Sequence, residues 1–221
     1  LSGYFVKSCY LSGNYFGAAE AVDTVISNIE LADIQVSPID IALIRTRKLK
    51  ALFNIGNSEQ IINLVNEDIM PDLEKGLDAK NNDTKYKGLV VDAWLHSKTI
   101  LAKAYGMQGN NNIFNVISEL KQFLDKYSYN TEFYTVQIAL LEAFGNTITG
   151  EIHKSNELLN AISLRTKNRV MEPELLSEWN LINVINRIFL GERDGLKADL
   201  FELAAFTNNI NEHFMKNIIK L

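Results

Sequence analysis

Three lysines recur at matching places in this sequence. Lys7, Lys50 and Lys103 each lie six residues before a glycine that interrupts a helical pattern, and Phe144 and Ile185 hold the same place before two later glycines. A lysine ammonium group makes charge-assisted hydrogen bonds with carboxylates, whereas Phe and Ile offer apolar contact. If these positions share one surface, we expect that surface to change from cationic to apolar along the chain.

Positions two or three residues before the same glycines extend this surface. They add Tyr10, Asn54 and Met107 in the first three cases, and Ile148, Ile188 and Phe189 in the last two. The candidate partner-binding groove therefore comprises Lys7, Tyr10, Lys50, Asn54, Lys103, Met107, Phe144 and Ile185. Such a groove suits a peptide with an acidic or carboxylate-bearing end and an apolar end, and Asn54 can pair with peptide backbone. The alternative is that the lysines are solvated and the apolar residues pack against the C-terminal helix.

Residues for catalysis or metal binding do not form a recognisable pattern. The sequence lacks a GxxxxGK[ST] phosphate loop, HExxH, GxSxG and any spaced Cys/His cluster. His96, His153 and His213 are isolated, and we expect ordinary surface or half-buried side chains there. Cys9 falls on the apolar side of its helix, which favours a small core residue over a nucleophile. We predict no catalytic residue, no metal site and no cofactor.

The densest positive charge is the run RTRKLK, residues 45–50. It is too short for a nucleic-acid site, and a solvated helix face is the expected structure. The formal net charge of −5 also argues against a general nucleic-acid-binding surface. We therefore expect no direct nucleic-acid binding by this segment.

Apolar residues recur at intervals of three and four almost throughout, and sustained two-residue alternation is scarce, so the sequence predicts an all-α protein. Three prolines, Pro38, Pro71 and Pro173, are each expected in the first turn of a helix, where a missing N–H costs least. The expected helices span 3–12, 15–33, 38–54, 58–68, 71–80, 85–107, 112–127, 131–145, 150–163, 173–190, 194–206 and 209–220.

Helix-breaking glycines repeat along the chain. They are Gly13, Gly56, Gly109, Gly150 and Gly191, at intervals of 43, 53, 41 and 41 residues. Spacings of this size are typical of arrays of helical hairpins. The predicted units span 1–36, 37–80, 85–128, 130–170 and 172–207, followed by a capping segment at 208–221.

The first unit, YLSGNYFGAAEAV, resembles the tetratricopeptide repeat (TPR) family, with Gly13 followed by Tyr15 and Ala18. The third unit keeps Tyr105 and Gly109 of this arrangement. The resemblance implies one domain over 1–221, a right-handed α–α superhelix of about five helical hairpins with a C-terminal capping helix. Because the family repeat is about 34 residues, a HEAT- or armadillo-like array and a non-repeating helical bundle remain alternatives.

The resemblance also implies a function. Some family members clamp a peptide carboxylate with Lys and Asn from successive first helices, and Lys7, Lys50 and Asn54 loosely match that chemistry. Similar long-helix arrays follow DNA-binding or ATPase modules in bacterial regulators. We expect a non-catalytic protein- or peptide-binding domain, such as the sensor part of a larger transcription-regulator-like protein. The alternatives are a structural scaffold subunit of a multiprotein complex and, third, an enzyme.

Composition fits a globular domain of this kind. At 221 residues, 47% hydrophobic and 10% aromatic, the chain can bury a substantial core. No apolar run approaches the roughly 18 residues of a membrane span, so no membrane association is expected. A lone cysteine fits a reducing compartment, and we predict a cytoplasmic location. Because the chain begins at Leu rather than Met, we expect a fragment of a longer protein.

Overall fold

The computed structural model describes residues 2–78, 84–127, 131–166 and 171–209, and these parts are helical with no strand. This confirms the expected all-α class. The predicted capping segment at 208–221 lies outside the described residues, apart from its first two positions. None of the described helices is both long enough and apolar enough to cross a membrane.

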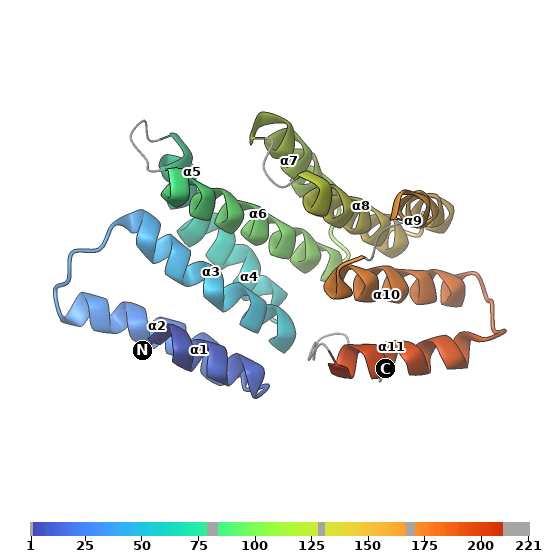
Figure 1. Ribbon diagram of the computed structural model, residues 1–221, viewed down its shortest axis with the longest axis horizontal. Helices are drawn as coiled ribbons and strands as arrows, with labels where there is room; N and C mark the ends of the chain where they lie inside the picture. The colour runs from blue at the N-terminus through green and yellow to red at the C-terminus, as the bar shows by residue number, and fades with distance from the viewer. Residues whose placement is uncertain (1, 79–83, 128–130, 167–170, 210–221) are drawn as a thin grey trace. The chain divides into compact units, whose positions relative to one another are not determined.

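The chain divides into two compact units, Leu1–Ala104 and Tyr105–Leu221, with the boundary inside one helix. Each unit is described by itself. The first contains α1 (Ser2–Leu11), α2 (Tyr15–Leu31), α3 (Pro38–Ile55), α4 (Ser58–Asn63), the π-helix η1 (Leu64–Ile69), α5 (Met70–Asp78) and most of α6 (Thr84–Met107) (Figure 1). The second contains the last turn of α6, α7 (Asn112–Tyr127), α8 (Thr131–Ile148), α9 (Ile152–Thr166), α10 (Pro173–Phe189) and α11 (Leu196–Asn209). The single domain expected over 1–221 stays a prediction.

Five helix ends share one backbone motif, and it falls at the glycines that the sequence singled out. Gly13, Gly56, Gly109, Gly150 and Gly191 all have φ between +64° and +84°. In each case the glycine N–H donates to the carbonyl three residues earlier, and the next N–H donates to the carbonyl five residues earlier, at 2.8–3.2 Å. This is the Schellman ending, which needs the left-handed conformation that glycine adopts at little cost. The helix ends predicted at these five glycines are confirmed.

The second hairpin differs from its prediction. Pro38 and Pro173 begin helices as expected, but Pro71 does not, because α4, η1 and α5 run continuously from Ser58 to Asp78. In an ordinary helix Pro71 would remove a hydrogen bond and press its ring on the carbonyl of Glu67. The π-helical stretch widens the turn just before the proline and so accommodates it. The predicted break between 68 and 71 is therefore wrong.

Hydrophobic packing in the first unit centres on α3. This helix contacts α2, α4, η1 and α5, and its Leu49 is fully buried. Complete burial of one such side chain contributes about 1.5–3 kcal/mol. A Cβ built on Gly76 of α5 would lie 3.3 Å from both Ile39 of α3 and Val90 of α6, so these three helices pack closely. Residues of α1, α3 and α6 line a common space in this unit.

The second unit has its own core and a buried polar network. The core cluster comprises Val136, Leu140, Ala143, Leu159, Ile162, Leu175 and Ile182 from α8, α9 and α10. Beside it, Asn186 accepts a hydrogen bond from Thr147 at 2.7 Å and donates to Ser155 and Asn156, both at 2.8 Å. Because polar groups buried without partners are costly, this network favours one register of the three helices.

Candidate functional site

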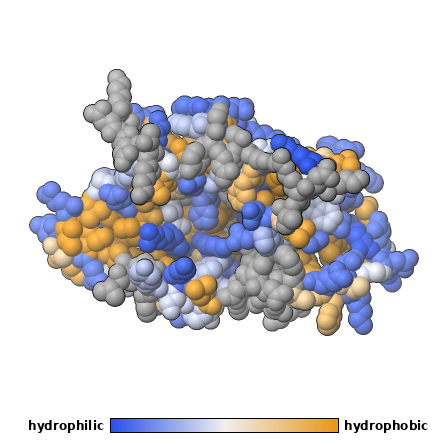
Figure 2. Space-filling view, in the orientation of Figure 1, coloured by the Kyte–Doolittle hydropathy of each residue, from blue (hydrophilic) through white to orange (hydrophobic). Residues whose placement is uncertain are grey.

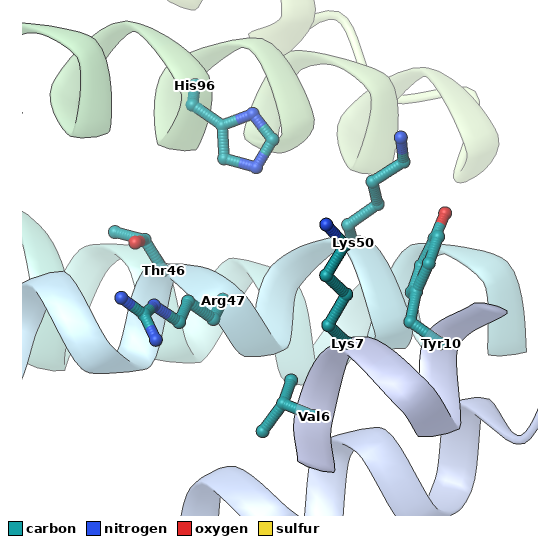
Figure 3. A pocket seen from close by; sticks show the side chains of 7 residues that line it. All are labelled: Val6, Lys7, Tyr10, Thr46, Arg47, Lys50 and His96. Carbon is teal, nitrogen blue, oxygen red and sulfur yellow. The ribbon is translucent and has the colours of Figure 1, made fainter. Parts of the chain in front are cut away.

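A cavity of about 360 Å³ opens among α1, α3 and α6 in the first unit. Seven side chains line it: Val6, Lys7, Tyr10, Thr46, Arg47, Lys50 and His96 (Figure 3). Figure 3 shows His96 extending from α6 toward the space, while Lys7 and Tyr10 extend from α1 and Lys50 from α3. Three of the seven carry permanent positive charge and none is acidic, so the lining suits an anion.

Helical spacing brings these residues together. Residues three and four apart lie on one face of a helix, so Lys7 and Tyr10 share a face of α1, and Thr46 and Lys50 share a face of α3. Arg47, three residues before Lys50, lies beside them. Lys7 and Lys50, predicted for one groove from the spacing before Gly13 and Gly56, do line the same cavity.

The four cations of the run RTRKLK have two kinds of surroundings: two form ion pairs and two line the cavity. Arg45 contacts η1, with Nη1 at 3.4 Å from the carbonyl and 3.5 Å from a carboxylate oxygen of Asp68. The ammonium of Lys48 turns the other way and bonds both carboxylate oxygens of Asp23 on α2, at 2.6 and 2.8 Å. Arg47 and Lys50 face the cavity instead. The run is thus not a uniform solvated face, because two of its cations form ion pairs within the fold.

Asn54 contributes to the site indirectly. Its side chain is buried, and its amide donates to the Lys50 carbonyl at 2.8 Å and to the Tyr10 hydroxyl at 3.2 Å. The Lys50 ammonium also lies 5.4 Å from the centre of the Tyr10 ring, within the range of a cation–π contact. Asn54 therefore holds Tyr10 and the adjoining backbone in place at one end of the cavity.

Lys103 does not line this cavity. Its ammonium lies 5.7 Å from the centre of the Phe53 ring, so α6 meets α3 through a cation–π contact at this position. Lys103 belongs to the same unit as Lys7 and Lys50, and it is half-buried. Its predicted contribution to a longer groove stays a prediction.

Three predicted groove residues, Met107, Phe144 and Ile185, belong to the second unit and are half-buried. Phe144 packs against the core cluster of that unit. Its ring also lies against Gly106, where an added Cβ would come within 2.4 Å of a ring carbon. Phe144 thus serves the packing of α8 on the end of α6, and a single groove through all five units stays a prediction.

Sequence reasoning missed four residues of the cavity: Val6, Thr46, Arg47 and His96. Thr46 and Arg47 lie four and three residues before Lys50, and Val6 lies four residues before Tyr10, so applying helical spacing to Lys50 and Tyr10 would have found them. His96 carries no such signal, because it comes from a helix separated from the others in sequence. Of the remaining histidines, His153 is exposed and His213 lies outside the described residues.

The cavity lining offers cationic and hydroxyl groups, which hold anions, and no carboxylate to ligate a metal cation. Comparison of the chain with protein-family models, with curated proteins and with solved structures found no match. The geometry of this cavity is therefore the basis for the functional argument below.

Proposed function

We propose that this chain is a non-catalytic domain that binds a protein or peptide through an acidic group or a free carboxylate held in the α1–α3–α6 cavity. The observation that carries the proposal is that Lys7, Arg47 and Lys50 all line one cavity, which has no acidic lining residue. An anionic group bound there would gain charge-assisted hydrogen bonds from these side chains.

We further propose that the helical hairpins form a TPR-like right-handed superhelix that serves as the sensor part of a larger regulator. The five identical Schellman turns support a repeated hairpin unit. The regulatory context rests on the resemblance of the first unit to TPR sequences. Small-angle scattering of the purified chain tests the architecture, since a superhelix and a globular bundle of equal mass differ in maximum dimension.

The binding proposal is tested by reversing the charge of one cavity residue. We expect Lys50→Glu to weaken binding of acidic peptides by about tenfold or more, because a charge-assisted contact becomes repulsive. The measurement is fluorescence anisotropy with a panel of labelled acidic peptides that carry free or amidated C-termini. Circular dichroism and the melting temperature are followed in parallel to verify folding, because Lys50→Glu also removes the cation–π contact with Tyr10.

Two further variants make the test specific. Lys154→Glu changes net charge equally at an exposed site in the second unit, and binding should be retained. Lys103→Glu shows whether the ligand extends beyond the cavity toward Phe53. Equal affinity of the unmodified chain, Lys50→Glu and Lys154→Glu would disprove binding in the cavity.

A scaffold subunit is the second candidate, and exposed apolar side chains favour it. Leu31 and Ile34, where α2 gives way to α3, are 85% and 56% exposed. Figure 2 shows hydrophobic surface gathered at this end of the first unit, at the left of the view (Figure 2). A partner docked there would be lost with Leu31→Asp and retained with Lys50→Glu, which is the reverse of the result expected for the cavity.

A further inference from the structure

We propose that a cavity between α10 and α11 binds a guanidinium group, presented as an arginine side chain by a peptide or a partner protein. The cavity has a volume of about 310 Å³ and lies within the second unit, where the two helices pack side by side (Figure 1). It is separate from the α1–α3–α6 cavity of the first unit. The inference therefore goes beyond the proposed function and does not rest on it.

Helical spacing places the polar groups of this cavity on one face of each helix. Asn180, Asn183 and Arg187 are three and four residues apart, so they share a face of α10, and Asp199 and Glu202 share a face of α11. All five side chains line the cavity. Its lining thus combines the amide groups of α10 with the carboxylates of α11.

The charge of Arg187 is already balanced within the unit. Its guanidinium group bonds the carboxylates of Asp199 and Glu192 and the carbonyl of Asp194. Glu202, which is exposed and lies one turn after Asp199, has no ion pair or hydrogen bond from its side chain among the described residues. Because Arg187 and Asp199 offset each other, Glu202 leaves the lining with a negative charge that a cation can balance.

The two asparagines add hydrogen-bonding groups that the fold does not use. Asn180 and Asn183 are half-buried, and neither side chain has a hydrogen-bond partner in the part of the chain that the structure describes. Asn186, on another face of the same helix, is instead fully buried and bonded to side chains of α8 and α9. The asparagines that line the cavity therefore keep their amide oxygens available to accept from a ligand.

This lining favours a guanidinium group over an ammonium group. A guanidinium carries five N–H donors in one plane, which suits acceptors that come from two helices, whereas an ammonium is a compact point charge. The ring of Trp179 also lines the cavity, and its Nε1–H donates to the Leu159 carbonyl at 3.1 Å, which fixes the ring. Guanidinium groups associate with aromatic rings more often than ammonium groups do.

The size of the cavity is consistent with such a ligand. Its volume of about 310 Å³ corresponds to about ten water molecules at about 30 Å³ each. That space holds a guanidinium group and part of its aliphatic stem. The buried side chains of Val184 and Leu203, which also line the cavity, offer apolar contact to the stem.

The inference is tested by NMR titration of the whole isotope-labelled chain, read at the side-chain amide signals of Asn180 and Asn183. The probes are acetyl-Gly-Ala-Arg-Ala-Gly-amide, the same peptide with citrulline, the same peptide with lysine, and the methylguanidinium ion. Citrulline keeps the shape of arginine without its charge. We expect the arginine peptide to bind about tenfold more tightly than the citrulline peptide and several-fold more tightly than the lysine peptide.

Variants locate the binding in the cavity. Glu202→Gln should weaken binding of the arginine peptide by about tenfold and change binding of the citrulline peptide little, because only the charge is removed. Glu157→Gln makes the same charge change at an exposed position of α9 outside the lining, and binding should be retained. Circular dichroism of each variant verifies that it folds. Equal weakening by the two substitutions would place the binding outside this cavity.

The remaining outcomes decide the chemistry of the ligand. Equal affinity for the arginine and citrulline peptides would overturn the recognition of charge, and equal affinity for the arginine and lysine peptides would overturn the preference for guanidinium. Binding of methylguanidinium without binding of the arginine peptide would overturn a peptide side chain as the source. Failure of all four probes to bind would overturn the inference as a whole.

The result is distinguishable from a failure of the proposed function. Lys50→Glu, which tests the α1–α3–α6 cavity, should leave binding of the arginine peptide unchanged. Glu202→Gln should likewise leave binding of acidic peptides unchanged. Each substitution therefore affects one of the two proposed sites.

Discussion

At the scale of single residues, Lys48 is a buried cation whose position the fold must compensate. Its side chain is 10% exposed, and its ammonium bonds both carboxylate oxygens of Asp23, which is 56% exposed. Burying an ammonium group without a partner is unfavourable, whereas the aliphatic stem of lysine packs well against apolar neighbours. The ion pair therefore links α2 to α3. It also offsets the desolvation cost of burying the Lys48 ammonium group.

A substitution pair tests this interpretation of Lys48. Asp23→Ala should lower the free energy of unfolding by about 1–3 kcal/mol, less than for a fully buried pair because Asp23 is half-exposed. Lys48→Met should cost less than Asp23→Ala, because it removes the charge and keeps the stem. Urea unfolding of both single variants and the double variant measures the coupling. The interpretation fails if Lys48→Met is the more destabilising change.

At the scale of elements, the helix ends at Gly56, Gly109, Gly150 and Gly191 depend on a backbone conformation rather than on side-chain contacts. Gly150 between α8 and α9 has φ of +84°, and no atom lies within 4 Å of a Cβ built there. Space is available for a side chain, so the left-handed backbone alone disfavours other residues. At Gly106, by contrast, a side chain is disfavoured because its Cβ would collide with the Phe144 ring.

The turn at Gly150 provides an element-scale prediction. Gly150→Ala should lower the free energy of unfolding by about 1 kcal/mol, because alanine is strained in the left-handed region. Gly150→Asn should cost less, because asparagine tolerates that region better. Thermal and urea unfolding of both variants measure the difference. Equal stability of Gly150→Ala and the unmodified chain would show that the turn does not require its φ.

At the scale of the whole molecule, stability should depend on the ionisation of Tyr86. Its hydroxyl, on α6, donates to Asp40 at the start of α3 at 3.2 Å, and Ser37 caps the same helix end. Desolvation, followed by the negative charge of Asp40, raises the pKa of Tyr86 above its ordinary value. Because the folded state favours the neutral hydroxyl, this contribution is fully present below about pH 10. It is lost as pH rises through the folded pKa.

The alkaline prediction compares the unmodified chain with Tyr86→Phe. The difference in free energy of unfolding between the two should be largest near pH 8 and should shrink by pH 11.5 as Tyr86 ionises. Urea unfolding monitored by circular dichroism at both pH values measures it. The other tyrosines are present in both proteins and cancel in the comparison. A constant difference across this range would contradict the expected linkage.

Charge distribution is also decided at this scale. The chain has a formal net charge of −5, yet the cavity lining carries three permanent positive charges. Net charge predicts the behaviour of the average surface, and it correctly discourages a general polyanion-binding surface. It contains no information about a local site, because helix packing selects which side chains meet.

The sequence by itself determined the helical class, most helix boundaries and the five turns. These features follow from local signals, namely apolar spacing and the glycines. A helix ending in the left-handed conformation depends only on the residues at that end. Helical spacing before Gly13 and Gly56 was also enough to place Lys7 and Lys50 on corresponding faces. Pro71 misled the prediction, because a local rule for proline does not foresee a π-helical turn that accommodates it.

Tertiary structure alone decided which cations share a site. Arg45 and Lys48 pair with aspartates on other elements, whereas Arg47 and Lys50 line a cavity together with Lys7 and His96. Arg45, Arg47, Lys48 and Lys50 all lie within residues 45–50, so composition does not distinguish them. Their different surroundings come from the direction in which each side chain leaves α3 and from the helix packed on that side. The cavity therefore exists only once α1, α3 and α6 have packed together.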